Sequence, residues 1–208
     1  MEITRGSEAN MRMTVVTAVA ALITGQLVGC AHLEGQRPLV VMQPHEGEHL
    51  WVFPDGKGNL GTGGELQIFL DAESHPDAKA SFAKFTLGVG GALPIHRHDK
   101  TAELAYFLSG TGMVISVDGD GNEVEVPVSS GYVWYNPPGV WHAVRNTGTA
   151  PLSMVFATIP NEKKGLLSCF RRVCVGPGKE GVRIPEDELQ RLGREHDLIF
   201  RGPNMHGH

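Results

Sequence analysis

The sequence lacks the features that mark several large classes of protein. Its 208 residues contain no run of lysines or arginines and carry a formal net charge of −5, which argues against nucleic-acid binding. No internal repeat or low-complexity block is present, which argues against a repeat architecture. The apolar stretch at 15–28 is shorter than the roughly 20 residues that a membrane-spanning helix needs. What remains is a chain with 41% hydrophobic residues, long enough to bury the core of one large domain or two small ones.

The first thirty residues differ from the rest of the chain in the manner of a secretion signal. The stretch 15–28 fits the apolar region of a signal peptide, and Arg12 supplies positive charge if translation starts at Met11. The stretch ends in Leu27-Val28-Gly29-Cys30, which resembles the lipobox of bacterial lipoproteins. This resemblance implies a signal peptide over 1–29 and a lipid on Cys30.

The lipobox resemblance also implies a location. The mature chain is expected to be anchored to a membrane through the lipid on Cys30 and to face the periplasm or the cell surface. If the lipobox is not used, the protein is expected to be secreted without an anchor. A buried apolar segment that ends in a cysteine by chance is the remaining interpretation.

Cysteine is scarce, with three residues in all. If Cys30 carries lipid, Cys169 and Cys174 remain as a pair in an oxidising compartment. Their spacing, CFRRVC, closes a small loop, and we expect a disulfide between them. Two buried free thiols, or half of a metal site, are the alternatives.

Glycine and proline are frequent instead, with 27 and 13 residues, and they divide the middle of the chain into short segments. Runs such as ELQIFLDA, ELAYFLSG and GMVISVDG have the length and composition of strands, and turn residues separate them. The sequence DGDGN at 118–122 is a hairpin signal. Residues 64–160 are therefore predicted to form an all-β antiparallel sandwich or barrel.

The segments that flank this region have a different character. Residues 31–63 begin with a polar stretch and are expected to form an N-terminal arm. Residues 161–208 are expected to form a C-terminal extension. Within it, IPEDELQRLGREHDLIF predicts a short helix that begins near Pro185, with acidic residues in its first turn.

One stretch, GGALPIHRHDKTAELAYFLSG at 90–110, has the pattern of a metal site. In a strand His96 and His98 point to the same side, and Glu103 opens the next strand after a turn. Two imidazoles and a carboxylate on adjacent strands supply three ligands on one face of a metal. His142 opens a later strand and becomes a fourth ligand if the barrel brings it close.

Two stretches of the chain resemble the two sequence motifs of the cupin superfamily. The first motif, G-x5-H-x-H-x4-E-x6-G, matches at Gly90, His96, His98, Glu103 and Gly110. The second, G-x5-P-x-G-x2-H-x3-N, matches at Gly131, Pro137, Gly139, His142 and Asn146. The end of the chain is similar to the tails of single-domain, quercetin-dioxygenase-like cupins. The resemblance implies a jelly-roll barrel, also called a double-stranded β-helix, with a metal near its middle.

In that superfamily the residues that match His96, His98, Glu103 and His142 are the metal ligands. Three neutral imidazoles and one carboxylate suit a divalent Fe, Mn, Ni, Co, Cu or Zn ion. Six-coordinate metal would keep two positions for water, O₂ or a chelating substrate. Glu103 either ligates throughout or swings away and acts as a general base. The candidate substrate-binding side chains are Phe107, Val144, Trp134 and Trp141.

These features predict a metal-dependent, dioxygenase-type oxidoreductase that acts on a small aromatic or enolic molecule. Two alternatives stay open. One is a metal-dependent isomerase, epimerase or lyase of sugars or keto acids, and the other is a metal- or ligand-binding protein without turnover. The expected partners are the small-molecule substrate, the membrane through the lipid anchor, and a second copy of the chain that pairs through strand edges.

Overall fold

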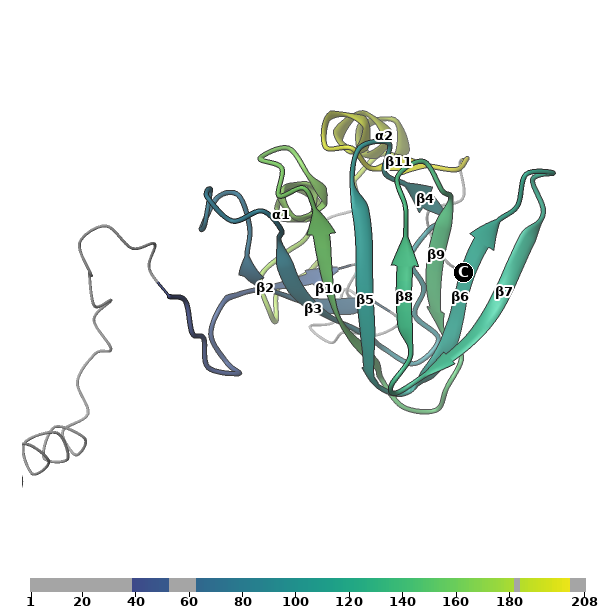
Figure 1. The fold of residues 1–208 in the computed structure, drawn as a ribbon, viewed down its shortest axis with the longest axis horizontal. Coiled ribbons are helices and arrows are strands. Elements are labelled where there is room, and N and C mark those ends of the chain that lie inside the picture. Colours follow the sequence, from purple (N-terminus) through teal and green to yellow (C-terminus); the bar gives the residue numbers. More distant parts are fainter. Residues whose placement is uncertain (1–38, 53–62, 182–183, 203–208) are drawn as a thin grey trace, which may run out of the picture. The chain divides into compact units, whose positions relative to one another are not determined.

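A computed structural model describes residues 39–52, 63–181 and 184–202, and their strands form two antiparallel sheets (Figure 1). The first sheet has the order β1-β2-β3-β10-β5-β8 and the second has the order β11-β4-β9-β6-β7. The strands of the first sheet are β1 (Glu48–Val52), β2 (Gly64–Leu70), β3 (Phe82–Leu87), β5 (Ala102–Ser109), β8 (Val133–Asn136) and β10 (Leu152–Ile159). Those of the second are β4 (His96–Arg97), β6 (Thr111–Val117), β7 (Glu123–Ser129), β9 (His142–Asn146) and β11 (Ile199–Phe200).

The pairing joins strands that are far apart in the sequence. β3 lies beside β10, and β4 lies between β9 and β11. From β3 to β10 the chain crosses repeatedly from one sheet to the other, so the barrel is a jelly-roll (Figure 1). The predicted all-β jelly-roll with a short C-terminal helix is therefore confirmed.

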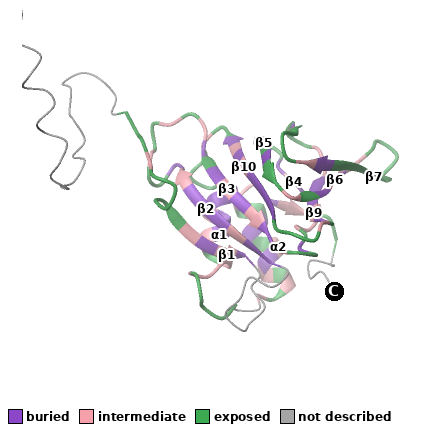
Figure 2. Ribbon diagram, turned by 90° about the horizontal axis from the view of Figure 1, so that it is seen from below, coloured by how far each residue is buried: buried purple, intermediate pink, exposed green. Residues whose placement is uncertain are grey.

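Side chains of alternate residues in the strands fill the barrel. In β5, Glu103, Ala105 and Phe107 are buried, whereas Leu104 and Tyr106 between them are exposed. The same alternation runs through β3. Figure 2 shows the buried residues spread over strands of both sheets, which is where a barrel core is expected. The core cluster includes Leu66, Phe85, Phe107, Val144, Leu152 and Phe156.

Two turns that the sequence marks are present in the fold. The predicted hairpin at 118–122 joins β6 to β7, and Asp118 N donates to Asn122 O at 3.0 Å. Gly110, the last residue of the first motif, has a φ of +83°. A Cβ on Gly110 would lie 2.5 Å from the carbonyl oxygen of Pro151, so both conformation and space require glycine there.

The C-terminal extension contains two helices, α1 (Leu166–Val173) and α2 (Glu186–Glu195). The predicted helix is confirmed as α2, whose N-cap is Pro185. The sequence analysis did not predict α1, which buries Leu166, Leu167 and Phe170 against the barrel core.

The predicted disulfide between Cys169 and Cys174 is wrong, because both thiols are free. Their segment forms α1 rather than a loop, and Cys174 is its C-cap. At Cys174 the backbone is extended, with φ −102° and ψ 169°. Cys169 is fully buried, and burial raises the pKa of its thiol to about 12.

The N-terminal part of the chain is described only from residue 39. β1 lies within the predicted arm over 31–63, and it pairs with β2 as an outer strand of the six-stranded sheet. The predicted signal peptide over 1–29, with its lipobox at 27–30, and Cys30 lie outside the described residues. Among the residues that the structure describes, no helix is both long and apolar enough to cross a membrane.

Asn146, the last residue of the second motif, ties three segments together. Its side chain is 1% exposed, and Oδ1 accepts from Gly148 N at 2.9 Å. Its Nδ2 donates to the carbonyl oxygens at the end of β3 and in the turn before β10, at Leu87, Gly88 and Ala150. Asn146 is therefore a structural residue of the barrel.

We predict that Asn146→Ala destabilises the protein by about 2–3 kcal/mol, because it leaves buried carbonyl groups without a donor. Chemical denaturation measures this loss. Asn122→Ala, in the exposed hairpin turn, is the control and is expected to cost less than about 1 kcal/mol. Equal losses in the two variants would contradict the structural role of Asn146.

Candidate metal centre

The structure brings four buried side chains together inside the barrel. His96 is in β4, His98 directly follows it, Glu103 is in β5 and His142 opens β9. One donor atom from each of the four lies within 4.8 Å of the others. His96 and His142 face each other across the β4–β9 pair. The convergence depends on strand pairing between residues more than forty positions apart.

Hydrogen bonds fix the orientation of all three imidazole rings. In each ring Nδ1 lies within hydrogen-bond distance of a backbone carbonyl oxygen, which can only accept. Nδ1 therefore carries the hydrogen, and Nε2 keeps its lone pair. The three pairs are His96 with Pro94 at 2.7 Å, His98 with Asp197 at 2.7 Å and His142 with Val140 at 2.9 Å.

Two of the opposite ring nitrogens have no hydrogen-bond partner among the described residues. Nε2 of His98 and Nε2 of His142 are buried and unpaired. The nearest carboxylate oxygen, Glu103 Oε2, lies 3.7 Å from the first and 3.4 Å from the second. Lone pairs and a carboxylate that face one another repel, and a cation between them would remove the repulsion. The donor set therefore fits a divalent metal.

Burial favours the neutral form of His96 and His98. The cost of placing charge in the interior lowers the pKa of His96 well below its usual range, and the neighbouring His142 and His98 lower it further. Burial also lowers the pKa of His98, although the charge of Glu103 opposes this shift. Neutral imidazoles can donate their Nε2 lone pairs at physiological pH without first losing a proton.

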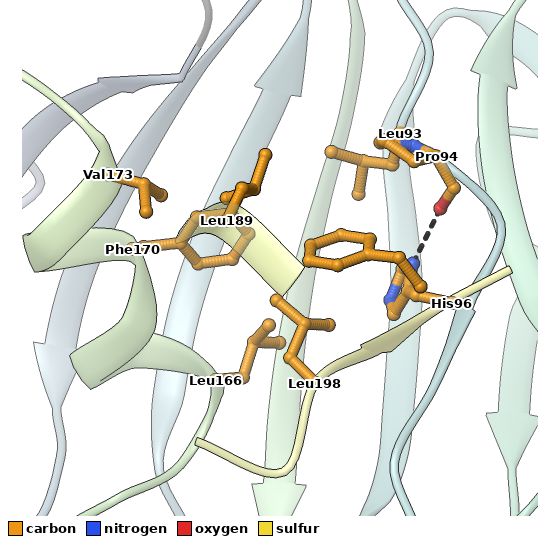
Figure 3. Close-up of a pocket in the computed structure, with 9 residues that line it drawn as sticks. Leu93, Pro94, His96, Leu166, Phe170, Val173, Leu189 and Leu198 are labelled. Atoms are coloured by element: carbon orange, nitrogen blue, oxygen red, sulfur yellow. Dashed lines mark hydrogen bonds between the residues drawn. The ribbon is translucent and has the colours of Figure 1, made fainter. Parts of the chain in front are cut away.

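An apolar pocket lies beside the ring of His96 (Figure 3). The pocket lies between the barrel and the C-terminal extension, and the ring of His96 forms one wall. Phe200 of β11 lies against that ring, with 6.4 Å between the ring centroids. Of the four donor residues only His96 lines this pocket, so the pocket lies outside the donor set. Its lining residues are Leu93, Pro94, His96, Leu166, Phe170, Val173, Leu189, Leu198 and Phe200.

Asp197, between α2 and β11, supports the centre and was missed by the sequence analysis. Its backbone oxygen orients His98. Its carboxylate accepts from Asp99 N at 2.9 Å, Lys100 N at 3.1 Å and Thr101 Oγ1 at 2.9 Å, which holds the turn between β4 and β5. Asp197 has a φ of +56°, in the left-handed region. No local sequence signal links it to a turn almost one hundred residues earlier.

The structure distributes the four predicted substrate-binding residues unequally. Trp134 lies at the centre, with its ring centroid 5.3 Å from that of His142. Phe107 and Val144 are buried in the core, on the same strand faces as Glu103 and His142. They form the apolar surroundings of the donor set.

Trp141 is not brought to the donor set. It directly precedes His142, and neighbouring residues in an extended chain point to opposite sides. The guanidinium of Arg97 lies 4.7 Å from the centroid of the Trp141 ring. Arg97 itself lies between His96 and His98, so it points away from the centre as well. This cation–π contact, rather than substrate binding, accounts for Trp141 in the structure.

The lowered pKa of His96 predicts that the metal-free protein loses stability as the pH falls below about 6.5, the usual histidine pKa. There the unfolded chain takes up a proton that the folded chain resists, so the loss approaches about 1.4 kcal/mol per pH unit for this residue. Thermal denaturation of chelator-treated protein from about pH 7.5 to 5.5 measures the slope. His96→Asn should reduce the slope to the part that His98 contributes, and the exposed-site control His45→Gln should leave it unchanged.

Asp197→Gly is predicted to weaken metal retention about 10- to 100-fold, although it removes no ligand. Glycine tolerates the observed φ, so the loss reports on the carboxylate that holds the turn beside His98. Competition with a chelator measures the affinity. Asp187→Gly, at an exposed position of α2, is the control. Equal retention by the Asp197 variant and the wild type would contradict the supporting role.

Comparison with known proteins agrees with this arrangement. Residues 83–158 match the Cupin_2 family, described as a cupin domain. An oxalate-binding protein of Thermotoga maritima is 28% identical over 104 residues, which are 50% of this chain and 78% of the relative. The solved structure of a predicted oxalate decarboxylase from Thermotoga maritima is 27% identical. That similarity covers 59% of this chain and 99% of the other, with a TM-score of 0.46.

A second solved structure is that of a conserved Klebsiella pneumoniae protein with a double-stranded β-helix domain. It is 17% identical and covers 46% of this chain and 76% of its own, with a TM-score of 0.40. The family match spans the strands that carry all four donor residues. Both sequence motifs lie within the residues that match the cupin domain family.

Proposed function

We propose that the protein holds one divalent transition metal through His96, His98, Glu103 and His142 and acts as a dioxygenase-type oxidoreductase on a small aromatic or enolic substrate. One observation supports this most directly. Two buried imidazole nitrogens without a hydrogen-bond partner face the same carboxylate. A protein interior rarely keeps such atoms unpaired unless a ligand satisfies them.

The residues of the chain have distinct roles in this proposal. A bound metal would supply a Lewis acid with open positions for O₂ and a chelating substrate. The three imidazoles, held by backbone carbonyls, supply oriented donors. Glu103 completes the set, or accepts the proton of a substrate hydroxyl, and its side chain is only 7% exposed.

The surroundings of the donor set suit a flat, weakly polar substrate. Ala105, Phe107 and Val144 are almost completely buried beside it and exclude water. Trp134 is partly buried and offers an aromatic wall next to His142. Aromatic side chains bind flat ligands by stacking or by edge contacts.

A second candidate function is the binding or conversion of oxalate or a similar small dicarboxylate. The observation in its favour is the Thermotoga maritima oxalate-binding protein, which aligns with half of this chain. A dicarboxylate can chelate a metal through two oxygens, as an enediol or catechol can, so both candidates use the same open positions. The metal-dependent isomerase or epimerase and the non-catalytic binding protein remain the other readings of the same donor set.

The location of the protein and its partners stay predictions from the sequence. The lipid anchor on Cys30, the periplasmic or cell-surface location and a homodimer through strand edges are proposed on the grounds given above. They do not bear on the chemistry of the donor set.

Elemental analysis of protein purified without chelator tests the metal centre. The wild type is expected to carry about one divalent transition metal per chain, because the four donors form one site. The double variant His96→Ala/His98→Ala should carry almost none. A control double variant, His45→Ala/His75→Ala, removes two histidines outside the site and should keep its metal. Wild type without metal after reloading, or a full complement in the first variant, would overturn the centre.

Oxygen consumption with a panel of catechols, flavonols and oxalate then separates the candidate reactions. The proposal predicts uptake of O₂ with an aromatic or enolic compound by metal-loaded wild type, and none by the His96→Ala/His98→Ala variant. Turnover of oxalate alone would favour the second candidate. Substrate isomerisation without O₂ uptake, or tight metal binding with no response to any compound, would overturn the dioxygenase assignment.

A further inference from the structure

One buried amide near the four donor residues makes no hydrogen bond through its nitrogen. Asn136 ends β8, and its side chain is 2% exposed. Its Nδ2 has no hydrogen-bond partner within the described residues. The described part of the chain holds three other buried, unpaired side-chain atoms. Two are the Nε2 atoms of His98 and His142, and the third, Arg97 Nε, has the Asp99 carboxylate at 2.9 Å. For Nδ2 of Asn136, no hydrogen bond or ion pair is found among the described residues.

The strand register places this amide beside the donor set. β8 pairs with β5, and Asn136 is directly opposite Glu103. Residues directly opposite each other in an antiparallel pair project to the same face, with Cβ atoms about 4.5–5.5 Å apart. Trp134, two residues earlier on that face, contacts His142, whereas Tyr135 on the other face is 60% exposed. The register and its burial together indicate that Asn136 points into the barrel next to Glu103.

The turn that follows β8 offers no free backbone donor at this point. Pro137 and Pro138 have no N–H group. Gly139 N is already used, because it donates to His98 O at 2.7 Å. Between Asn136 and Gly139, the side chain of Asn136 is thus the available donor.

We propose that Asn136 Nδ2 donates a hydrogen bond to an oxygen of the carboxylate, enolate or phenolate that binds at the metal centre. The assignment rests on the proposed function. A buried donor without an acceptor destabilises the free protein, so such a group is kept where a ligand completes it. Asn136 therefore favours ligands that place an oxygen opposite its amide, because a ligand without that oxygen leaves the amide unpaired. Asn136 is a substrate-binding residue and not a metal ligand.

The stability of the metal-free protein gives a first test. Asn136→Leu removes the unpartnered amide at nearly constant volume, so it is expected to raise the melting temperature by about 2–4 °C. Tyr135→Phe, on the exposed face of the same strand, is the control and should leave the melting temperature unchanged. A fall in stability on Asn136→Leu would show that the amide is paired within the fold, and it would overturn the proposal.

Ligand binding to the metal-loaded protein gives the second test, with oxalate and catechol as probes and calorimetry as the measurement. Asn136→Leu should keep the full metal content and bind the probe about tenfold more weakly or worse, because one hydrogen bond to a charged acceptor is lost. Tyr135→Phe should bind as the wild type does. Unchanged affinity in the Asn136 variant, or a loaded wild type that binds neither probe, would overturn the assignment.

The two tests separate this proposal from the proposed function. A wild type that takes up no metal overturns the centre, and the role of Asn136 with it. A wild type that takes up metal and binds a probe, beside an Asn136 variant that binds equally well, overturns the role of Asn136 alone.

Discussion

The donor set depends on three imidazole rings that are held inside the barrel with their hydrogen on Nδ1. Each Nδ1 bonds to a backbone carbonyl, so each Nε2 lone pair is directed inwards. Backbone carbonyls of a strand end or a turn hold their positions more firmly than side chains do. The direction of the lone pairs is therefore set by the fold itself. Burial then keeps His96 and His98 uncharged, which is the state in which they can act as ligands.

The C-terminal extension belongs to this centre as much as the barrel does. Asp197 supplies the carbonyl for His98 and fixes the turn that separates it from Glu103. Phe200 lies against His96, and apolar side chains of the extension line the pocket that His96 borders. The cupin match ends at residue 158, so these contacts come from outside the matched segment. The barrel supplies the four donors and orients two of the rings, and the extension orients the third, His98, and packs beside His96.

The sequence predicted what short-range patterns can encode. The spacing of His96, His98 and Glu103 follows from the two-residue period of strands, and the turn at 118–122 follows from its residue types. It could not predict contacts that only the closed fold creates, such as Asp197 with the β4–β5 turn. The two cysteines show a different limit, because a compartment argument suggested a disulfide where the local pattern of Leu166, Leu167 and Phe170 makes a helix.

The charge of the centre narrows the ligands that it can accept. A divalent cation with a Glu103 carboxylate as its one anionic ligand would leave one positive charge in an apolar interior, since an imidazole that binds a metal through its lone pair is uncharged. Such a charge attracts an anion strongly, because the surroundings screen it poorly. Asn136 is suited to binding such an anion, because an amide donates a hydrogen bond without adding charge. A lysine at this position would repel the metal. A neutral donor opposite Glu103 therefore selects for oxygen anions and leaves the affinity for the cation intact.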